Sequence, residues 1–162
     1  MQYYYSYHTS IGEIWIVEED GFIVNVKYTL DISNIKERET PLIKKTYHQI
    51  AEYLKNKRET FDIPLRLKGT KFQQRVWAAL QTIPYGEVWS YKHLAKVIDC
   101  PKGCRAVGNA NNRNPIAIII PCHRVVGING ELVGYAGGIN IKKQLLDIEQ
   151  NENTEVVRII DI

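Results

Sequence analysis

The stretch Ile116–Arg124 reads Ile-Ala-Ile-Ile-Ile-Pro-Cys-His-Arg, an apolar run that ends in a proline, a thiol and an imidazole. A short run rich in β-branched residues predicts a buried strand, here over residues 116–120. Such a strand places Cys122 and His123 side by side at its end. Because only the thiolate is a strong nucleophile, and a neighbouring base raises its fraction, the pair indicates nucleophilic chemistry. The alternative is a buried core cysteine beside an unrelated histidine.

The chain has the size and composition of a soluble globular protein. Its 162 residues suffice for one domain or two small ones, and 44% of them are hydrophobic. No apolar run reaches the length of a membrane span, and the first residues lack the features of a secretory signal. Three cysteines are an odd and small number for a disulfide framework. We therefore expect a cytoplasmic protein with no membrane partner.

The net charge of +3 is unevenly distributed along the chain. Residues 1–68 carry ten Lys and Arg against ten Asp and Glu, whereas residues 69–150 carry ten against five. The last twelve residues hold one Arg and three acids. A basic second half favours a polyanionic partner such as nucleic acid. A solvated lysine surface accounts for the surplus equally well.

Residues 1–68 predict a small supporting domain of antiparallel strands and one helix. The segments Gln2–His8, Gly12–Glu18 and Gly21–Tyr28 are short, β-branched and aromatic, and a tight turn separates the last two into a hairpin. Pro41 then opens a helix. Its apolar face consists of Ile43, Tyr47, Ile50 and Leu54.

Residues 69–150 predict a mostly helical domain, followed by a tail over residues 151–162. Ser90 can cap a helix over about Tyr91–Ile98, and another runs from about Lys102 to Asn112. Two short helices joined by a tight turn, in the basic half of the chain, predict a helix-turn-helix. A glycine-rich loop then leads to a final helix. The apolar residues expected to share a face of that helix are Ile141, Leu145 and Ile148.

These features together resemble one family. Their order over about Gly69–Glu149 closely resembles the O6-alkylguanine-DNA alkyltransferases, which move an alkyl group from guanine to their own cysteine. Residues 1–68 resemble that family's N-terminal domain only loosely. The residues that carry the resemblance are Pro121–Val126, Ser90, Tyr91, Arg105–Gly108, Asn114, Pro115, Tyr135, Gly137, Gly138 and Glu149.

The resemblance implies an α/β fold and single-use DNA repair. The fold would combine a ribonuclease-H-like N-terminal domain with a helical domain that contains a winged-helix-like helix-turn-helix. Cys122 would accept the alkyl group of O6-alkylguanine, and of O4-methylthymine, without a cofactor or metal. His123 would take the thiol proton through a water, and Glu149 would orient the imidazole. Without the resemblance, Glu149 is better explained as an exposed charge at a helix end.

The resemblance also implies a monomer that binds double-stranded DNA through the minor groove and flips the damaged nucleotide. Arg105 would fill the vacated space, and Tyr91 would press on the flanking phosphate. The same helix would present Ala106, Gly108 and Asn111. A surface cation and a half-buried aromatic are the alternatives for Arg105 and Tyr91.

Contacts with the flipped guanine follow from the same resemblance. The Tyr91 hydroxyl would bind and protonate N3, and Asn114 would order the hinge before the active-site strand. Further contacts would come from the carbonyls of Cys122 and Val125, the Ala136 N–H, and a lid formed by Tyr135 and Gly137.

The sequence departs from the family pattern in three places. Many relatives have an apolar residue where Asn111 stands and a serine where Ala136 stands, and some carry N-terminal zinc ligands that residues 1–68 lack. We expect ordinary thiols at Cys100 and Cys104. Surface or half-buried positions are expected for the other histidines, His8, His48 and His93.

Three other functions stay open on the sequence. A binding-only relative would flip damaged guanine for other factors, but it would lack the acceptor thiol. A helix-turn-helix regulator that senses alkylation would need an effector domain, for which the chain is short. A cysteine hydrolase would need a path for water to release its product.

Overall fold

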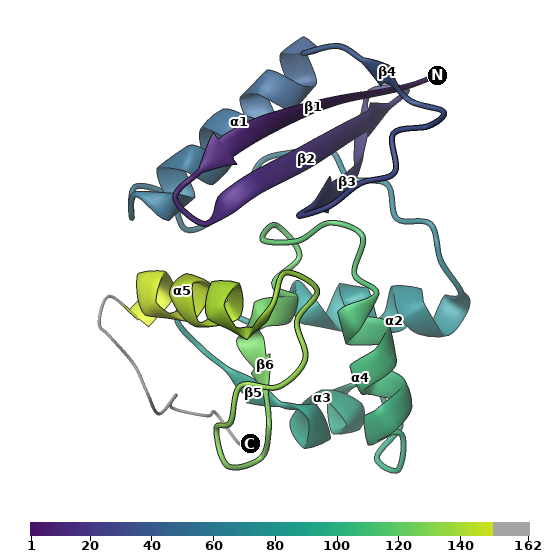
Figure 1. Cartoon of the computed structure of the whole chain (residues 1–162). Coiled ribbons are helices and arrows are strands. Elements are labelled where there is room, and N and C mark those ends of the chain that lie inside the picture. Colours follow the sequence, from purple (N-terminus) through teal and green to yellow (C-terminus); the bar gives the residue numbers. More distant parts are fainter. Residues whose placement is uncertain (151–162) are drawn as a thin grey trace. The chain divides into compact units, whose positions relative to one another are not determined.

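The computed structural model describes residues 1–150 and divides the chain into two compact units. The first unit is Met1–Lys68 together with Pro115–Ile119, and the second comprises Gly69–Asn114 and, within the described residues, 120–150. The predicted α/β class, with a sheet unit and a mostly helical unit, is confirmed (Figure 1).

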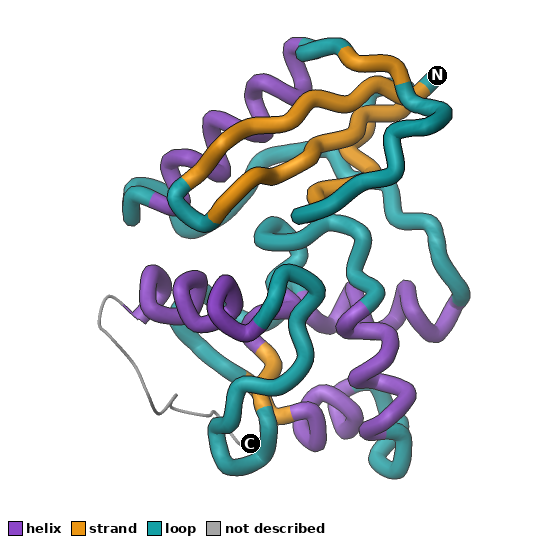
Figure 2. The backbone as a smooth tube through the Cα atoms, viewed as in Figure 1, coloured by secondary structure: helices purple, strands orange, loops and turns teal. Residues whose placement is uncertain are grey.

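The first unit is a four-stranded sheet with one helix packed against it. The strands are β1 (Gln2–Thr9), β2 (Gly12–Glu19), β3 (Phe22–Lys27) and β4 (Lys36–Glu37), in the order β3-β2-β1-β4. The β1–β2 and β2–β3 pairs are antiparallel, as expected, and β4 lies parallel to β1. Figure 2 shows the long hairpin of β1 and β2 beside helix α1.

Helix α1 (Pro41–Leu54) begins where the proline predicts. The Thr40 side chain accepts a hydrogen bond from the Ile43 N–H at 3.1 Å, and Pro41 takes the first turn, where its missing N–H costs nothing. The buried face of α1 contains Ile43, Thr46, Gln49, Ile50 and Tyr53. The opposite face is left to solvent.

The strand predicted over residues 116–120 is wrong. Ile116 makes a single bridge to Val26, and the segment then turns instead of continuing the ladder. The backbone explains the difference, because Ile118 lies at φ +71° and the Ile119 N–H bonds to the Ala117 carbonyl at 2.8 Å. A left-handed residue ends a strand. The apolar run is buried, but as an irregular segment.

The second unit contains four α-helices within the described residues. They are α2 (Lys71–Leu80), α3 (Tyr91–Val97), α4 (Cys104–Asn112) and α5 (Ile139–Gln150). Two short strands, β5 (Trp89–Ser90) and β6 (Val125–Val126), pair in parallel. Thr70 and Gln73 form a capping box at the start of α2, and the Trp77 indole N–H donates to the Ala110 carbonyl of α4 at 2.9 Å.

The predicted helix pair is present as α3 and α4, with one boundary changed. Ser90 caps α3 by accepting from the His93 N–H at 3.0 Å. Helix α4 begins at Cys104 rather than Lys102, because Cys100–Gly103 closes a turn through a 2.9 Å bond from the Gly103 N–H to the Cys100 carbonyl. His93 is buried, and its ring meets Trp89 edge to face, so the half-buried or surface position expected for it is wrong.

Helix α5 buries a different face from the one its apolar residues predict. The buried positions are Lys142, Leu145, Leu146 and Glu149, whereas Ile141 and Ile148 are only partly covered. The interior face therefore carries a lysine and a glutamate on either side of two leucines. Of the helices described, none is both long and apolar enough to cross a bilayer.

Candidate active site

Cys122 opens a short 3-10 turn, Cys122–Arg124, directly after Pro121. The turn is held by a 3.0 Å bond from the Arg124 N–H to the Pro121 carbonyl. Cys122 is only 5% exposed. Burial raises the pKa of its thiol, whereas the Asn114 side chain and the Lys142 ammonium act in the opposite direction. At rest the residue is therefore a protonated thiol beside groups that favour its anion.

His123 and Arg124 both bind the Glu149 carboxylate, which is reached from helix α5. One carboxylate oxygen, Oε2, lies 2.6 Å from His123 Nε2 and accepts from Arg124 Nη2 at 3.0 Å. The other, Oε1, accepts from Arg124 Nε at 2.7 Å. The His123 and Glu149 side chains are at most 1% exposed. The three side chains form one buried hydrogen-bonded set.

This set fixes the proton on the imidazole. Burial lowers the pKa of His123 and outweighs the opposing effect of Glu149, so the ring is neutral at pH 7. An ionised carboxylate can only accept, so the proton of the neutral ring sits on Nε2. Nδ1 is then the basic nitrogen of His123. A neutral imidazole oriented by a carboxylate is the arrangement that a general base requires.

Glu149 stays ionised because of its two partners. Burial alone raises the pKa of this carboxyl, but His123 and Arg124 together bring the pKa below its ordinary value. Arg124 is itself buried, and its Nη1 donates to the Ile83 carbonyl at 2.6 Å. The arginine thus supplies the charge that keeps Glu149 anionic in the interior.

Tyr91 stands at the first position of α3 and links that helix to the loop after β6. Its hydroxyl donates to the Val133 carbonyl at 3.0 Å. Burial raises the pKa of Tyr91 to about 12, and the charge of a Cys122 thiolate adds to the effect. The phenol is therefore a protonated hydrogen-bond donor, and a negative charge on Cys122 raises its pKa further.

Lys142 of helix α5 binds the same loop. Its ammonium donates to the Val133 and Gly134 carbonyls at 2.9 and 3.3 Å, and it lies 5.7 Å from the centre of the Tyr91 ring. Burial lowers the pKa of Lys142 to about 8, and the negative charge of a Cys122 thiolate acts in the opposite direction. The lysine therefore places a positive charge near the sulfur.

Two asparagines surround the backbone of the cysteine turn. Asn114 Nδ2 donates to the Ile120 carbonyl at 2.7 Å, which ties the end of α4 to the residues before Cys122. Asn111 Nδ2 donates to the Cys122 carbonyl at 3.4 Å. Both contacts orient the turn that presents the thiol.

Two family models match the chain, one in each half. Residues 2–67 match the model of the 6-O-methylguanine DNA methyltransferase ribonuclease-like domain, and residues 71–151 match that of the DNA binding domain. A methylated-DNA–protein-cysteine methyltransferase of Bacillus subtilis is 44% identical over 93% of this chain and 96% of its own length.

The chain belongs to the 6-O-methylguanine DNA methyltransferase family. Solved structures of this family agree in fold. The O6-methylguanine methyltransferase of Mycobacterium tuberculosis superposes with a TM-score of 0.87 at 40% identity, covering 96% of both chains. A structure of the OGT protein of that organism in complex with DNA gives 0.86 at 41% identity, covering 92% of this chain and 93% of the other.

In this methyltransferase-family chain, the residues that the sequence predicts to be catalytic lie close together in the structure. Cys122, His123 and Glu149 lie in or beside one buried set, the Asn114 side chain lowers the pKa of the Cys122 thiol, and the charge of a Cys122 thiolate raises the pKa of Tyr91. Glu149 is not the exposed helix-end charge that its position alone suggests.

Of the residues predicted to bind DNA, some lie on the surface and one lies in the interior. Arg105 and Ala106 are exposed in the first turn of α4, and Gly108 lies against the Tyr91 ring. Asn111 is only 1% exposed, so its side chain belongs to the interior around Cys122 and not to the exposed face of the helix. Its contribution to DNA binding stays a prediction.

The residues nominated for the lid follow β6. Tyr135 and Gly137 are partly covered and Ala136 is exposed, in a turn closed by a 3.0 Å bond from the Gly138 N–H to the Tyr135 carbonyl. Val125 is fully buried in β6, where it pairs with Trp89. The Val125 N–H also donates to the Cys122 carbonyl.

Two residues of this family site were missed by sequence reasoning. Arg124 was read only as part of a motif, and Lys142 received no role. A lysine among apolar helix positions is normally assigned to the surface. The available signal was spacing, because Lys142 and Glu149 fall on one face of a helix that also contains Leu145 and Leu146.

Proposed function

We propose that this chain repairs DNA by direct reversal, transferring the O6-alkyl group of a guanine once and irreversibly to the sulfur of Cys122. The observation that carries the proposal is a buried thiol followed in the chain by a neutral histidine, whose other nitrogen is held by Glu149. Family membership supports the same chemistry, because the relatives are named methylated-DNA–protein-cysteine methyltransferases.

The transfer balances without a cofactor. The Cys122 thiol gives its proton through a water to Nδ1 of His123, and the thiolate attacks the alkyl carbon from the side opposite to O6. A sulfur–carbon bond forms and the carbon–O6 bond breaks. Tyr91 donates a proton to N3 of the departing guanine, and the proton held by His123 restores the phenol through solvent. The products are a neutral guanine and a thioether.

The remaining nominated contacts complete the proposed pocket. Lys142 and Asn114 stabilise the Cys122 thiolate as it forms. Because this negative charge develops only during the reaction, stabilising it lowers the activation barrier. Tyr91 exchanges its contact with the Val133 carbonyl for the base. The carbonyls of Cys122 and Val125 and the Ala136 N–H bind guanine edges, while Tyr135 and Gly137 cover it. O4-methylthymine is a second substrate on this scheme.

The proposed partner is double-stranded DNA, bound by a monomer in the cytoplasm. Helix α4 enters the minor groove, with Ala106 and Gly108 against the backbone and Arg105 in the space left by the flipped nucleotide. The exposed position of Arg105 supports this role. Residues 1–68 serve as the supporting domain and residues 69–150 as the alkyltransferase domain.

Stoichiometry tests the proposal. The protein is incubated with duplex DNA that contains one O6-methylguanine, and both the intact protein mass and the repaired base are measured. We expect one methyl group per protein and no turnover, and loss of both signals in Cys122→Ala. Cys104→Ala removes an exposed thiol and should react normally. Repair with unmodified protein would indicate a hydrolase, and binding without repair would indicate a damage reader or a regulator.

A pair of arginine variants tests the DNA contact separately. Arg105→Ala should slow repair of paired DNA far more than reaction with the free alkylated base. Arg113 is exposed at the other end of the same helix, so Arg113→Ala is the matched control. Equal losses on paired DNA and on free base would contradict the role given to Arg105.

A further inference from the structure

The charges of the first unit balance in number but not in position. Seven of the ten acidic residues in 1–68 precede Pro41, on the strands and their connections. Residues 41–58 instead carry five Lys and Arg with one Glu. The balanced total over residues 1–68 therefore conceals a strongly cationic surface on α1 and the turn that follows it.

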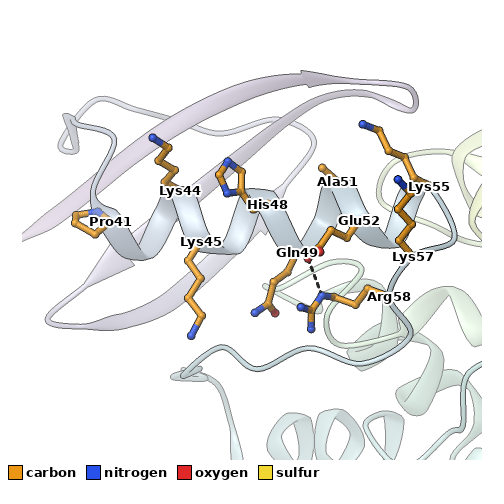
Figure 3. Close-up of a pocket in the computed structure, with 10 residues that line it drawn as sticks. All are labelled: Pro41, Lys44, Lys45, His48, Gln49, Ala51, Glu52, Lys55, Lys57 and Arg58. Carbon is orange, nitrogen blue, oxygen red and sulfur yellow. Dashed lines mark hydrogen bonds and ion pairs between the residues drawn. The ribbon is translucent and has the colours of Figure 1, made fainter.

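These cations line a groove of about 780 Å³ on the first unit, which we call the α1 groove (Figure 3). Its walls come mostly from exposed residues of α1, together with Gln49 of the buried face and with Lys57 and Arg58 after the helix. Figure 3 shows Lys44 and Lys45 near the start of the helix, and Lys55, Lys57 and Arg58 at its other end. The basic side chains of the lining are Lys44, Lys45, His48, Lys55, Lys57 and Arg58.

The negative charge at the α1 groove is already compensated. Glu52, the one carboxylate of the lining, accepts from Arg58 Nε at 3.0 Å. Lys45 lies 3.9 Å from Asp62, a pair so exposed that it contributes little. Among the described residues, Lys44, Lys55 and Lys57 make no ion pair within 4.0 Å. At least three cations are therefore available to an external anion.

The spacing of these cations suits an extended polyanion better than a small one. Lys44 and Lys55 are separated by about 16 Å along the helix, at a rise of about 1.5 Å per residue. One strand of B-DNA presents a phosphate every ~3.4 Å of axis, so this distance spans about five phosphates. An open groove with lysines at both ends matches a phosphodiester backbone.

We propose that the α1 groove is a second DNA-binding surface, which binds the phosphate backbone without reading sequence or damage. It contains no residue of the proposed active site. The surface would hold the protein on undamaged duplex by releasing counterions, which is the usual source of non-specific affinity. The first unit would then contribute a DNA contact of its own, besides the basic residues of 69–150, although residues 1–68 carry equal numbers of basic and acidic residues.

Two charge-matched variants test the proposal. The groove variant is Lys44→Glu with Lys55→Glu. The control is Lys27→Glu with Lys36→Glu, which changes the net charge by the same amount at exposed positions on β3 and β4. Affinity for undamaged duplex DNA is measured over a range of salt concentrations. We expect the groove variant alone to lose about tenfold or more at low salt, with the slope of log affinity against log salt reduced by about 2.

Folding and alkyl transfer are checked independently in the same variants. Both should melt like the unmodified protein and react normally with the free alkylated base, so a loss of DNA affinity is not a loss of structure or of the reaction. Because binding is read on undamaged DNA, failure of the proposed repair activity would leave the test intact. Equal losses in the groove and control variants, or no loss in either, would overturn the proposal. Binding of poly-L-glutamate is measured as well. If the groove variant alone lost this binding while its DNA affinity was unchanged, the proposal would be overturned in favour of an acidic protein partner.

Discussion

Glu149 must satisfy a permanent cation and a titratable base with one carboxylate. Its two oxygens are divided between Arg124 and His123, at distances from 2.6 to 3.0 Å. A neutral replacement keeps the shape of the side chain but leaves Arg124 charged in the interior. Removing one partner of a buried ion pair is far more costly than losing a surface pair.

We therefore predict that Glu149→Gln lowers the free energy of unfolding by about 3 kcal/mol. The measurement is urea denaturation at neutral pH. Asp147→Asn, which removes a partly exposed carboxylate paired with Lys143 on the same helix, is the control and should cost less than about 0.5 kcal/mol. Similar losses for the two variants would show that the buried set does not depend on its charge.

The same residues predict how stability depends on pH. The folded-state pKa of His123 lies below its ordinary value of 6.5, so the unfolded chain binds this proton first as the pH falls. The pKa of Glu149 is also lowered from its ordinary 4.5. Both groups therefore destabilise the fold on acidification, His123 below about pH 6.5 and Glu149 below about pH 4.5.

The His123 contribution can be isolated between about pH 7 and pH 5, where its slope approaches ~1.4 kcal/mol per pH unit. Denaturation curves across this range should show falling stability, and His123→Gln should flatten the slope. An unchanged slope in the variant would mean that another group titrates in this range.

At the scale of elements, helix α5 and the loop after β6 depend on each other. Lys142 reaches from α5 to two loop carbonyls, and Tyr91 reaches the Val133 carbonyl from α3. Gly134 adds a constraint, since it lies at φ +62° with a β-carbon position only 3.1 Å from Asn112 Nδ2. Another residue there would be strained and crowded. The loop is thus held at Val133 and Gly134 by α3 and α5.

We predict that Lys142→Met frees this loop. Hydrogen bonds from a charged donor contribute about 1.5–3 kcal/mol each, so protection of the amides after Val133 should fall by at least tenfold in hydrogen exchange. Transfer to Cys122 should also slow, because the positive charge near the sulfur is lost. Lys143→Met changes the neighbouring lysine, whose ammonium pairs with Asp147, and should leave the loop protected. Equal protection in both variants would contradict the role of Lys142.

Elements with a strong local signal were predictable from the sequence. Thr40-Pro41 and Ser90 place the starts of α1 and α3 because a cap and a proline act on their own helix. The strand over 116–120 failed because the run is apolar for a tertiary reason, and Ile118 turns the chain. The prediction for the buried face of α5 was also wrong, since Lys142 is stabilised in the interior by loop carbonyls outside the helix and Glu149 by Arg124, 25 residues earlier in the chain.

For the whole molecule, the order of motifs was enough to indicate the family and the α/β class. Cys122 and His123 were nominated because a thiol and an imidazole are consecutive in the chain, whereas Tyr91, Asn114 and Glu149 were nominated only through the family resemblance. Sequence could not show that Pro115–Ile119 belongs with the sheet unit, where it bonds to Val26. That property depends on contacts between segments that are far apart along the chain. The basic run over residues 41–58 can be counted in the sequence, but only the structure shows that its side chains line one groove.

Completion of the proposed reaction should destabilise the whole molecule. Cys122 is 5% exposed and the following residues through Val126 are buried, so an added methyl group enters a packed interior. Overpacking of this kind costs about 1–3 kcal/mol. A protein of this size loses roughly 2–4 °C in Tm for each kcal/mol.

We therefore predict a Tm lower by several degrees after reaction with O6-methylguanine, measured by calorimetry on protein whose mass shows one added methyl group. The Cys104→Ala variant treated identically should show the same shift, because its buried thiol is unchanged. Cys122→Ala should show no shift, since it has no acceptor. An unchanged Tm in fully methylated protein would mean that the cysteine turn has space for the product, and that the spent protein is as stable as the fresh one.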